Sequence, residues 1–284
     1  MHEALYNTAI KAAVEAGQAI LEVYRGDDFQ VTEKEDHSPL TKADRAAHKV
    51  IVSYLESTDI PILSEEGRDI PFSARSGWEQ FWLVDPLDGT KEFIKRNGEF
   101  TVNIALISSG NPVYGVVYAP VLGYLYVGIP GEGSWMLNNL NNDIRLKNVK
   151  QIGTRLPVSR SGGASASPFR VVASRSHLND ETKQYLGQIR DKNGEIEIVS
   201  KGSSLKLCMV ATDEADVYPR LGPTMEWDVA AAHAVVSGAG RDVFRLKKVD
   251  KVSSSPGNSG TRWEKYGKLK YNKKSLLNPY FLVT

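Results

Sequence analysis

The stretch "VDPLDGTKEF", residues 84–93, places two carboxylates three residues apart around a proline, and Gly-Thr follows them. The apolar run "FWLV", residues 81–84, leads directly into it and predicts a buried strand. Two negative charges at the end of a buried strand repel each other and lose their hydration, which is costly unless a positive charge lies nearby. The sequence therefore predicts a cation beside Asp85 and Asp88.

The composition is that of an ordinary globular protein, with 284 residues, 41% of them hydrophobic and 24% charged. The formal net charge of +1 gives no global argument for binding nucleic acid or a membrane surface. No apolar run approaches the roughly 20 residues that span a bilayer, and the N-terminal stretch lacks the pattern of a signal peptide. Cys208 is the only cysteine, which fits a reducing compartment. We therefore expect a soluble cytoplasmic protein without a transmembrane segment.

Apolar periodicity predicts two amphipathic helices, over residues 3–24 and 41–57, that pack side by side. Apolar, β-branched segments predict the strands that follow, at residues 60–64, 81–85, 100–107, 112–120 and 123–130. The last three have short connections, which indicates an antiparallel meander.

The second half predicts an alternation of strands and helices that is typical of an α/β unit. Strands are expected at 169–177, 195–200 and 216–221, and helices at 180–190, 203–215 and 226–240. The loop-rich stretch 138–168 is the candidate boundary, and 246–275 is predicted to be an exposed loop or hairpin. We therefore expect an α+β half over 1–145, which carries most metal ligands, and an α/β half over 146–284.

Four acidic groups stand at or near the ends of apolar stretches: Asp44, Glu65 with Glu66, Asp85 with Asp88, and Asp228. Each alone has an ordinary structural interpretation, as a helix N-terminal acid or a turn residue. Together they could converge on one point, where Mg²⁺ or Mn²⁺ would offset their repulsion. The oxygen-only set argues against zinc. Two metals about 3.5–4 Å apart would suit phosphoryl chemistry, with the phosphate against the backbone N–H groups of Gly89 and Thr90.

Three motifs in this order resemble the inositol monophosphatase superfamily of lithium-sensitive, Mg²⁺-dependent phosphatases. They are "LSEEG" (63–67), "WLVDPLDGT" (82–90) and "WDVAAAHAV" (227–235). Further stretches are similar to its branch of bacterial 3'(2'),5'-bisphosphate nucleotidases of the CysQ type: "SPLTKAD" (38–44), "SRSH" (174–177), "GSSLKLC" (202–208) and "YPRLGPTMEWDVAAAHAV" (218–235). The resemblance covers roughly residues 1–245, and "SLLNPYFLV" (275–283) also fits it.

The resemblance implies a layered αβαβα sandwich of the sugar-phosphatase type, with the active site between its two halves. It implies hydrolysis of adenosine 3',5'-bisphosphate (PAP) to AMP and phosphate, with the sulfated analogue PAPS as a related substrate. Two or three Mg²⁺ ions per site, inhibition by Li⁺ and a monomer or homodimer are expected. A peripheral position on the cytoplasmic face of the inner membrane stays open. So do two alternatives: a phosphatase of inositol monophosphate or another sugar phosphate, and a non-catalytic nucleotide-binding sensor.

The resemblance also implies roles for individual residues. Glu65 and Asp85, with the Leu87 carbonyl, would bind a first metal. Asp85, Asp88 and Asp228 would bind a second, and Glu66 would hold a further metal or its water shell. Thr90 with Asp44 would orient and deprotonate the attacking water, supported by Thr41.

Substrate contacts are implied at Gly89, Thr90, His177, Ser203, Lys206, Arg220 and Asp228. The cations Lys206 and Arg220 suit a second phosphate that the metals do not touch. His177 could instead be a hydrogen-bonded residue at a strand end, and Lys206 a solvated helix lysine. Trp227 is interpreted as core, and Cys208 as a small buried hydrophobe. Residues 138–168 and 246–264 exceed the family pattern and lie away from its motifs.

Overall fold

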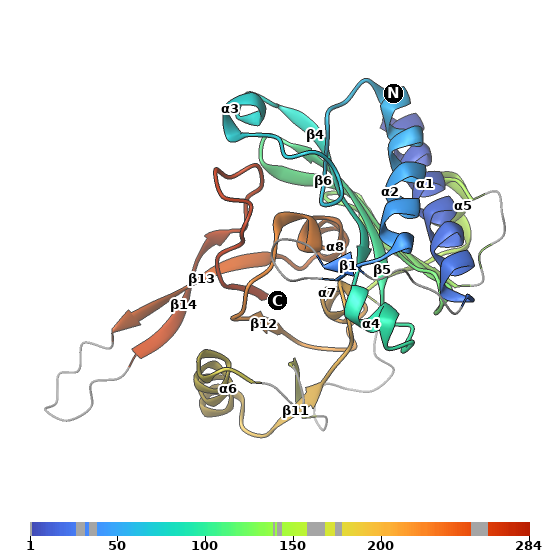
Figure 1. Ribbon diagram of the computed structural model, residues 1–284. Helices are drawn as coiled ribbons and strands as arrows, with labels where there is room; N and C mark the ends of the chain where they lie inside the picture. The colour runs from blue at the N-terminus through green and yellow to red at the C-terminus, as the bar shows by residue number, and fades with distance from the viewer. Residues whose placement is uncertain are drawn as a thin grey trace, which may run out of the picture.

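Helices and sheets alternate in layers through the molecule (Figure 1). The computed structural model describes residues 2–26, 32–33, 39–138, 140, 144–157, 168–173, 178–250 and 261–284. The layers run from the α1–α2 pair through a seven-stranded sheet and the α7–α8 pair to a four-stranded sheet, with α6 beyond it. The predicted αβαβα sandwich is therefore confirmed.

The seven-stranded sheet is buried on both faces. Its order is β3-β4-β5-β6-β7-β8-β9, with β3 parallel to β4 and every other neighbouring pair antiparallel. Along β4, Trp82 and Val84 join the core on one side, and Phe81 and Leu83 join the core on the other, because successive side chains of a strand alternate in direction. The predicted meander is confirmed. The strands are β3 (Ile62–Ser64), β4 (Gln80–Asp88), β5 (Thr101–Ser108), β6 (Asn111–Ala119), β7 (Tyr124–Ile129), β8 (Gly133–Asn138) and β9 (Thr154–Leu156).

Two helices, α1 (His2–Tyr24) and α2 (Lys42–Leu55), cover one face of this sheet, as the periodicity predicts. α1 turns a buried stripe rich in alanine toward α2 and the sheet, and small side chains let the helices approach closely. Thr41 caps α2 by accepting a hydrogen bond from Ala43 N at 3.1 Å. This cap fixes the start of the helix that carries Asp44.

The other face is covered by α7 (Leu205–Ala211) and α8 (Glu226–Gly238). α8 is apolar around most of its circumference because it lies in an inner layer, between the two larger sheets. It approaches β6 and β7 at two glycines. A Cβ atom on Gly115 would meet Ala231 O at 2.2 Å, and one on Gly128 would meet Val235 Cα at 2.3 Å.

The outer layer is a four-stranded sheet of order β12-β15-β13-β14, beside a parallel β10–β11 pair that α6 covers. β13 and β14 pair as an antiparallel hairpin that projects from the body (Figure 1), so the hairpin expected within 246–275 is confirmed for its described strands. These elements are β10 (Phe169–Val172), α6 (Asp180–Asn193), β11 (Ile196–Val199), β12 (Tyr218–Arg220), β13 (Val243–Asp250), β14 (Thr261–Lys268) and β15 (Phe281–Val283). Short elements complete the fold: β1 (Thr32–Glu33), β2 (Pro39–Leu40), η1 (Glu56–Thr58), α3 (Phe72–Arg75), α4 (Thr90–Ile94) and α5 (Leu146–Ile152).

The stretch 138–168, predicted to be loop-rich, contains two regular elements in its described part. Helix α5 and strand β9 lie there, and β9 pairs with β8 in the seven-stranded sheet. Leu146 and Val149 bury one side of α5, and Leu146 N donates to Asn7 Oδ1 at 2.7 Å. So few apolar positions among asparagines and lysines give a weak periodic signal. The division at 145/146 stays a prediction.

Other boundaries differ less. The strand expected over 169–177 spans 169–172, and residues 174–177 of it lie outside the described residues. The helix expected over 203–215 spans only 205–211. Among the described helices, none combines the length and the apolarity that a bilayer crossing requires.

Candidate metal centre and active site

Two parallel strands bring the first carboxylates together. Glu65 directly follows β3, and its N–H donates to Val84 O of β4 at 3.1 Å. This bond places Glu65 beside Asp85, whose side chain is only 1% exposed. Asp85 Oδ1 accepts a hydrogen bond from Leu87 N at 3.1 Å, and the pairing of β4 with β5 shifts register between Asp85 and Asp88. The proline between them explains this irregularity, because it removes a backbone donor from the strand.

The first turn of α8 supplies a third carboxylate from a distant part of the chain. Asp228 Oδ2 accepts a hydrogen bond from Met225 N at 2.9 Å, which holds the side chain at the start of the helix. One carboxylate oxygen each of Glu65, Asp85 and Asp228 lies within 4.8 Å of the other two. The structure thus brings together three of the predicted ligands, as an oxygen-only set that suits Mg²⁺ or Mn²⁺.

The electrostatics of this cluster also fit a cation. Burial raises the pKa of the Asp85 carboxyl well above its usual range, and the neighbouring charges of Glu65, Asp88 and Asp228 raise it further. Burial, followed by the charge of Asp88, raises the pKa of Asp228 to about 8, against the opposing effect of the Met225 hydrogen bond. These carboxylates destabilise one another when ionised, so a divalent cation among them would relieve a repulsion that the protein otherwise bears.

A second polar group lies beside the acids, where α2 meets α4. Asp44 is buried in the first turn of α2, and its Oδ2 accepts hydrogen bonds from Thr41 N at 2.7 Å and Thr41 Oγ1 at 2.5 Å. Its other oxygen accepts from Thr90 Oγ1 at 3.2 Å. The structure thus brings the predicted pair Asp44 and Thr90 into contact across 46 residues of sequence. Gly89, with φ of 92°, makes the turn between β4 and α4 that places Thr90 there.

Asp88 is held by serines that precede α7. Ser203 Oγ donates to Asp88 Oδ2 at 2.7 Å. Ser204 Oγ lies 2.9 Å from the same carboxylate oxygen and 2.7 Å from the Asp228 carbonyl oxygen, so its one proton serves two acceptors. Behind them, on β5, Thr101 Oγ1 lies 2.6 Å from Ser203 Oγ, and Asn103 Nδ2 donates to Ser204 Oγ at 3.0 Å. Ser204, Thr101 and Asn103 were missed by sequence reasoning. The predicted substrate contact of Ser203 stays a prediction, since its described hydroxyl bonds join Asp88 and Thr101.

Two predicted cations line cavities next to the carboxylates. A cavity of about 130 Å³ is bordered by Asp88, Gly89, Lys206, Arg220 and Asp228, among others. A second, of about 280 Å³, shares Lys206 and Arg220 with it.

The two cations are held by backbone carbonyls. Lys206 Nζ donates to Ser203 O at 3.1 Å, and Arg220 Nη2 donates to Pro223 O at 2.9 Å. Arg220 Nε is buried without a described hydrogen-bond partner, which leaves a charged donor available for an anion.

Two further predicted residues have less structural support. His177 lies outside the described residues. Glu66 is not part of the three-carboxylate group but lies close enough to His48 to act on it. Burial lowers the pKa of His48, and the charge of Glu66 opposes that shift. The role of Glu66 with a further metal stays a prediction.

Comparisons with known proteins agree on one family. A model of the inositol monophosphatase family matches residues 1–271. A protein of Salmonella typhimurium named 3'(2'),5'-bisphosphate nucleotidase CysQ is 49% identical over 232 residues, which cover 80% of this chain and 85% of that protein. One of Aggregatibacter actinomycetemcomitans with the same name is 34% identical over 98% of this chain and 92% of its own length. The crystal structure of CysQ from Bacteroides thetaiotaomicron matches with a TM-score of 0.83 and 43% identity, over 99% of this chain and 97% of that one.

Proposed function

The chain belongs to the inositol monophosphatase family, and on this basis we propose that it is a Mg²⁺-dependent phosphatase that hydrolyses PAP to AMP and phosphate. The predicted family resemblance is confirmed by the match over residues 1–271. The observation that carries the metal-dependent chemistry is the convergence of Glu65, Asp85 and Asp228 beside the Asp44–Thr90 pair. The nucleotide assignment rests on the relatives named 3'(2'),5'-bisphosphate nucleotidase.

We assign the metal ligands as the motifs indicate. Glu65, Asp85 and the Leu87 carbonyl would hold one Mg²⁺, and Asp85, Asp88 and Asp228 would hold another. Glu66 would hold a third ion or its water shell. Bound Mg²⁺ would neutralise charge on the phosphoryl oxygens and offset the mutual repulsion of the carboxylates. Buried carboxylates with raised pKa values and an all-oxygen donor set fit this ion.

Residues of the chain would then orient the attacking water and bind the phosphate that is cleaved. Because Thr90 Oγ1 donates to Asp44, its lone pairs can accept a hydrogen bond from the attacking water, which would orient that water. As the water attacks, its proton would pass to Thr90 Oγ1 while the Thr90 proton passes to the Asp44 carboxylate. Asp44 stabilises the arrangement as the hydrogen-bond acceptor of both Thr41 and Thr90. The N–H groups of Gly89 and Thr90 would bind the phosphate that is cleaved.

The second phosphate of PAP would meet Lys206 and Arg220. Both line the cavity that also contains Asp88 and Asp228, so an anion there would lie next to the reacting phosphate. A substrate with a single phosphate would leave these two cations unused. This arrangement favours a bisphosphate over inositol monophosphate.

The test is phosphate release from PAP, PAPS and inositol 1-phosphate, measured side by side in Mg²⁺ and in EDTA. Mg²⁺-dependent release from PAP, with little from inositol 1-phosphate, is the expected result. A preference for inositol 1-phosphate would overturn the nucleotide assignment but keep the metal centre. Tight binding of PAP without release in Mg²⁺ would identify a sensor instead. Gel filtration of the same preparation would separate monomer from homodimer.

A further inference from the structure

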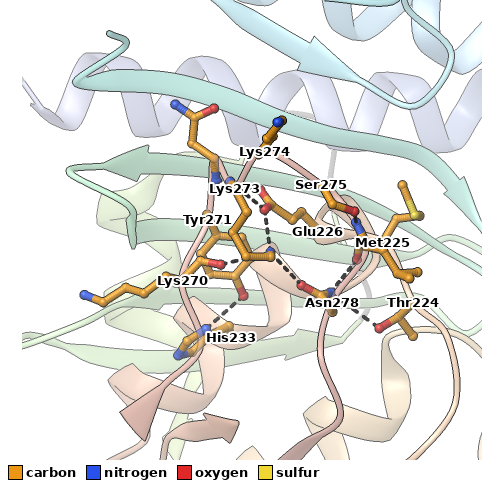
Figure 2. Close-up of polar contacts among 12 residues, drawn as sticks. Thr224, Met225, Glu226, His233, Lys270, Tyr271, Lys273, Lys274, Ser275 and Asn278 are labelled. Carbon is orange, nitrogen blue, oxygen red and sulfur yellow. Dashed lines mark hydrogen bonds and ion pairs between the residues drawn. The ribbon is translucent and has the colours of Figure 1, made fainter. Parts of the chain in front are cut away.

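The first residue of α8 is a buried carboxylate that the proposed chemistry does not use. Glu226 is 0% exposed. Its Oε2 accepts from Asn272 N at 2.7 Å, and its Oε1 accepts from Lys273 N at 3.0 Å and Lys273 Nζ at 2.5 Å (Figure 2). Burying an ion pair is seldom favourable in itself compared with an apolar pair of the same volume. The pair therefore calls for an explanation other than stability.

Lys273 joins this carboxylate to a longer segment near the C-terminus. Besides Glu226, its Nζ donates to Lys270 O at 3.1 Å and to Asn278 Oδ1 at 3.2 Å, so all three ammonium protons have acceptors. Figure 2 shows Lys273 between Glu226 and Asn278. The ammonium group thus fixes both ends of residues 270–278 around the start of α8.

Asn278 extends the contact to the residue that orients Asp228. Its Nδ2 donates to Met225 O at 2.8 Å, and its backbone N–H donates to Thr224 O at 2.8 Å. Glu226 N in turn donates to Leu276 O at 2.9 Å. Met225 is held by Asn278 through its carbonyl and holds the Asp228 carboxylate through its N–H. Residues 270–278 are therefore hydrogen-bonded to the turn immediately before α8.

Arg75 connects the same segment to the other side of the site. It is 3% exposed and ends α3, in the connection that leads from Glu65 back to β4. Its Nη1 donates to Asn272 Oδ1 and to Lys273 O, both at 2.8 Å, and Asn272 Nδ2 donates back to Arg75 O at 2.7 Å. One segment thus contacts both the turn before Asp228 and the connection that follows Glu65.

We propose that residues 270–278 are a brace that holds Asp228 in position for metal binding, with the Glu226–Lys273 ion pair as its centre. The carboxylates of the metal centre repel one another, so without a cation they tend to separate. A brace anchored outside the centre keeps the ligand positions fixed before the metal arrives. Glu226 and Lys273 are positioning residues: they act on Asp228 through Met225 and Asn278. The proposal rests on the metal centre of the proposed function.

The experiment measures metal affinity without substrate, by titrating the purified protein with Mn²⁺ and following free Mn²⁺ by electron paramagnetic resonance. Lys273→Met and Glu226→Gln should weaken Mn²⁺ binding about 10-fold, the lower end of the range seen when a direct partner of a metal ligand is removed, because both residues act on Asp228 through others. Lys273→Arg should recover most of the affinity. Lys274→Met is the matched control, because that exposed neighbour contributes only its carbonyl to the network, and it should bind Mn²⁺ like the wild type.

Unchanged Mn²⁺ affinity in folded Lys273→Met or Glu226→Gln would overturn the brace, even if both variants melt at lower temperature. Glu226→Gln keeps the shape and one oxygen acceptor, so it remains informative if Lys273→Met does not fold. Phosphate release by the wild type is measured in parallel. Loss of Mn²⁺ binding in the variants, with a wild type that releases no phosphate from PAP, would support the brace and refute the proposed reaction.

Discussion

Replacing Asp228 with asparagine should stabilise the metal-free protein while removing its metal binding. Burial and the charge of Asp88 raise the pKa of Asp228 from 3.8 to about 8. Because the folded-state value lies above the unfolded one, the ionised carboxylate costs stability as the pH rises. The cost is absent below pH 4, grows by about 1.4 kcal/mol per pH unit, and levels off above pH 8. Asparagine removes the charge and keeps an oxygen for the Met225 N–H.

At pH 7, about three units above the unfolded pKa, the wild type should be less stable than Asp228→Asn by about 4 kcal/mol. The assay is urea unfolding in EDTA at pH 5, 6, 7 and 8. The difference between the two proteins should widen by about 4 kcal/mol from pH 5 to pH 8. Glu197→Gln, on an exposed strand position, is the control for loss of one carboxylate and should show no such trend.

Magnesium should reverse this ranking. A cation that binds only the folded state stabilises the wild type in proportion to the logarithm of its concentration, whereas the variant has lost a ligand. The reasoning is refuted if Asp228→Asn is no more stable than the wild type at pH 8 in EDTA. It is equally refuted if the difference does not change with pH.

Further expectations concern individual parts of the site. Asp88→Asn should abolish turnover and leave the circular dichroism spectrum unchanged; a folded variant with wild-type activity would contradict the two-metal assignment. Ser204→Ala, which deletes the hydroxyl that Asp88 Oδ2 and the Asp228 carbonyl share, should raise the Mg²⁺ concentration for half-maximal activity about 10- to 100-fold, as a Mg²⁺ titration would show. Thr90→Val should lower kcat about 10²- to 10⁴-fold with little change in KM, and Thr90→Ser should keep most of it; equal losses would rule out a role for the hydroxyl. LiCl should inhibit phosphate release where NaCl at the same concentration does not.

Residues with a local chemical pattern could be predicted from the sequence. A single carboxylate at the end of an apolar stretch is ordinary, but several in one chain indicate a site, and the structure does bring Glu65, Asp85 and Asp228 together. The contact of Asp44 with Thr90 agrees with the pairing that the family resemblance implied. The long helices and the meander were predictable because their periodicity extends over many residues. Helix α5 was missed because seven residues with two buried positions give too little periodic signal.

Residues whose role depends on a partner far away in the sequence could not be predicted. Ser204 looks like an ordinary residue before a helix, and its partner Asp88 is 116 positions away. Glu226 lies two residues from Asp228, but nothing in its neighbourhood indicates that Lys273 will cover it. Such pairs are defined by the tertiary fold alone, since neither member has a pattern that requires the other. The second layer of a metal centre is therefore less visible in a sequence than the ligands.

The two glycines under α8 extend this reasoning to residues without any polar group. Glycine normally weakens a strand because it has no side chain to pack, and Gly115 and Gly128 both lie within strands. Here they let α8 lie so close to β6 and β7 that a Cβ atom would meet Ala231 O at 2.2 Å or Val235 Cα at 2.3 Å. A larger residue would push the helix outward, and Asp228 would move with it. Metal–ligand distances tolerate deviations of only about 0.2 Å. Close helix–sheet packing is therefore a condition of the proposed metal binding, although neither glycine can touch a metal.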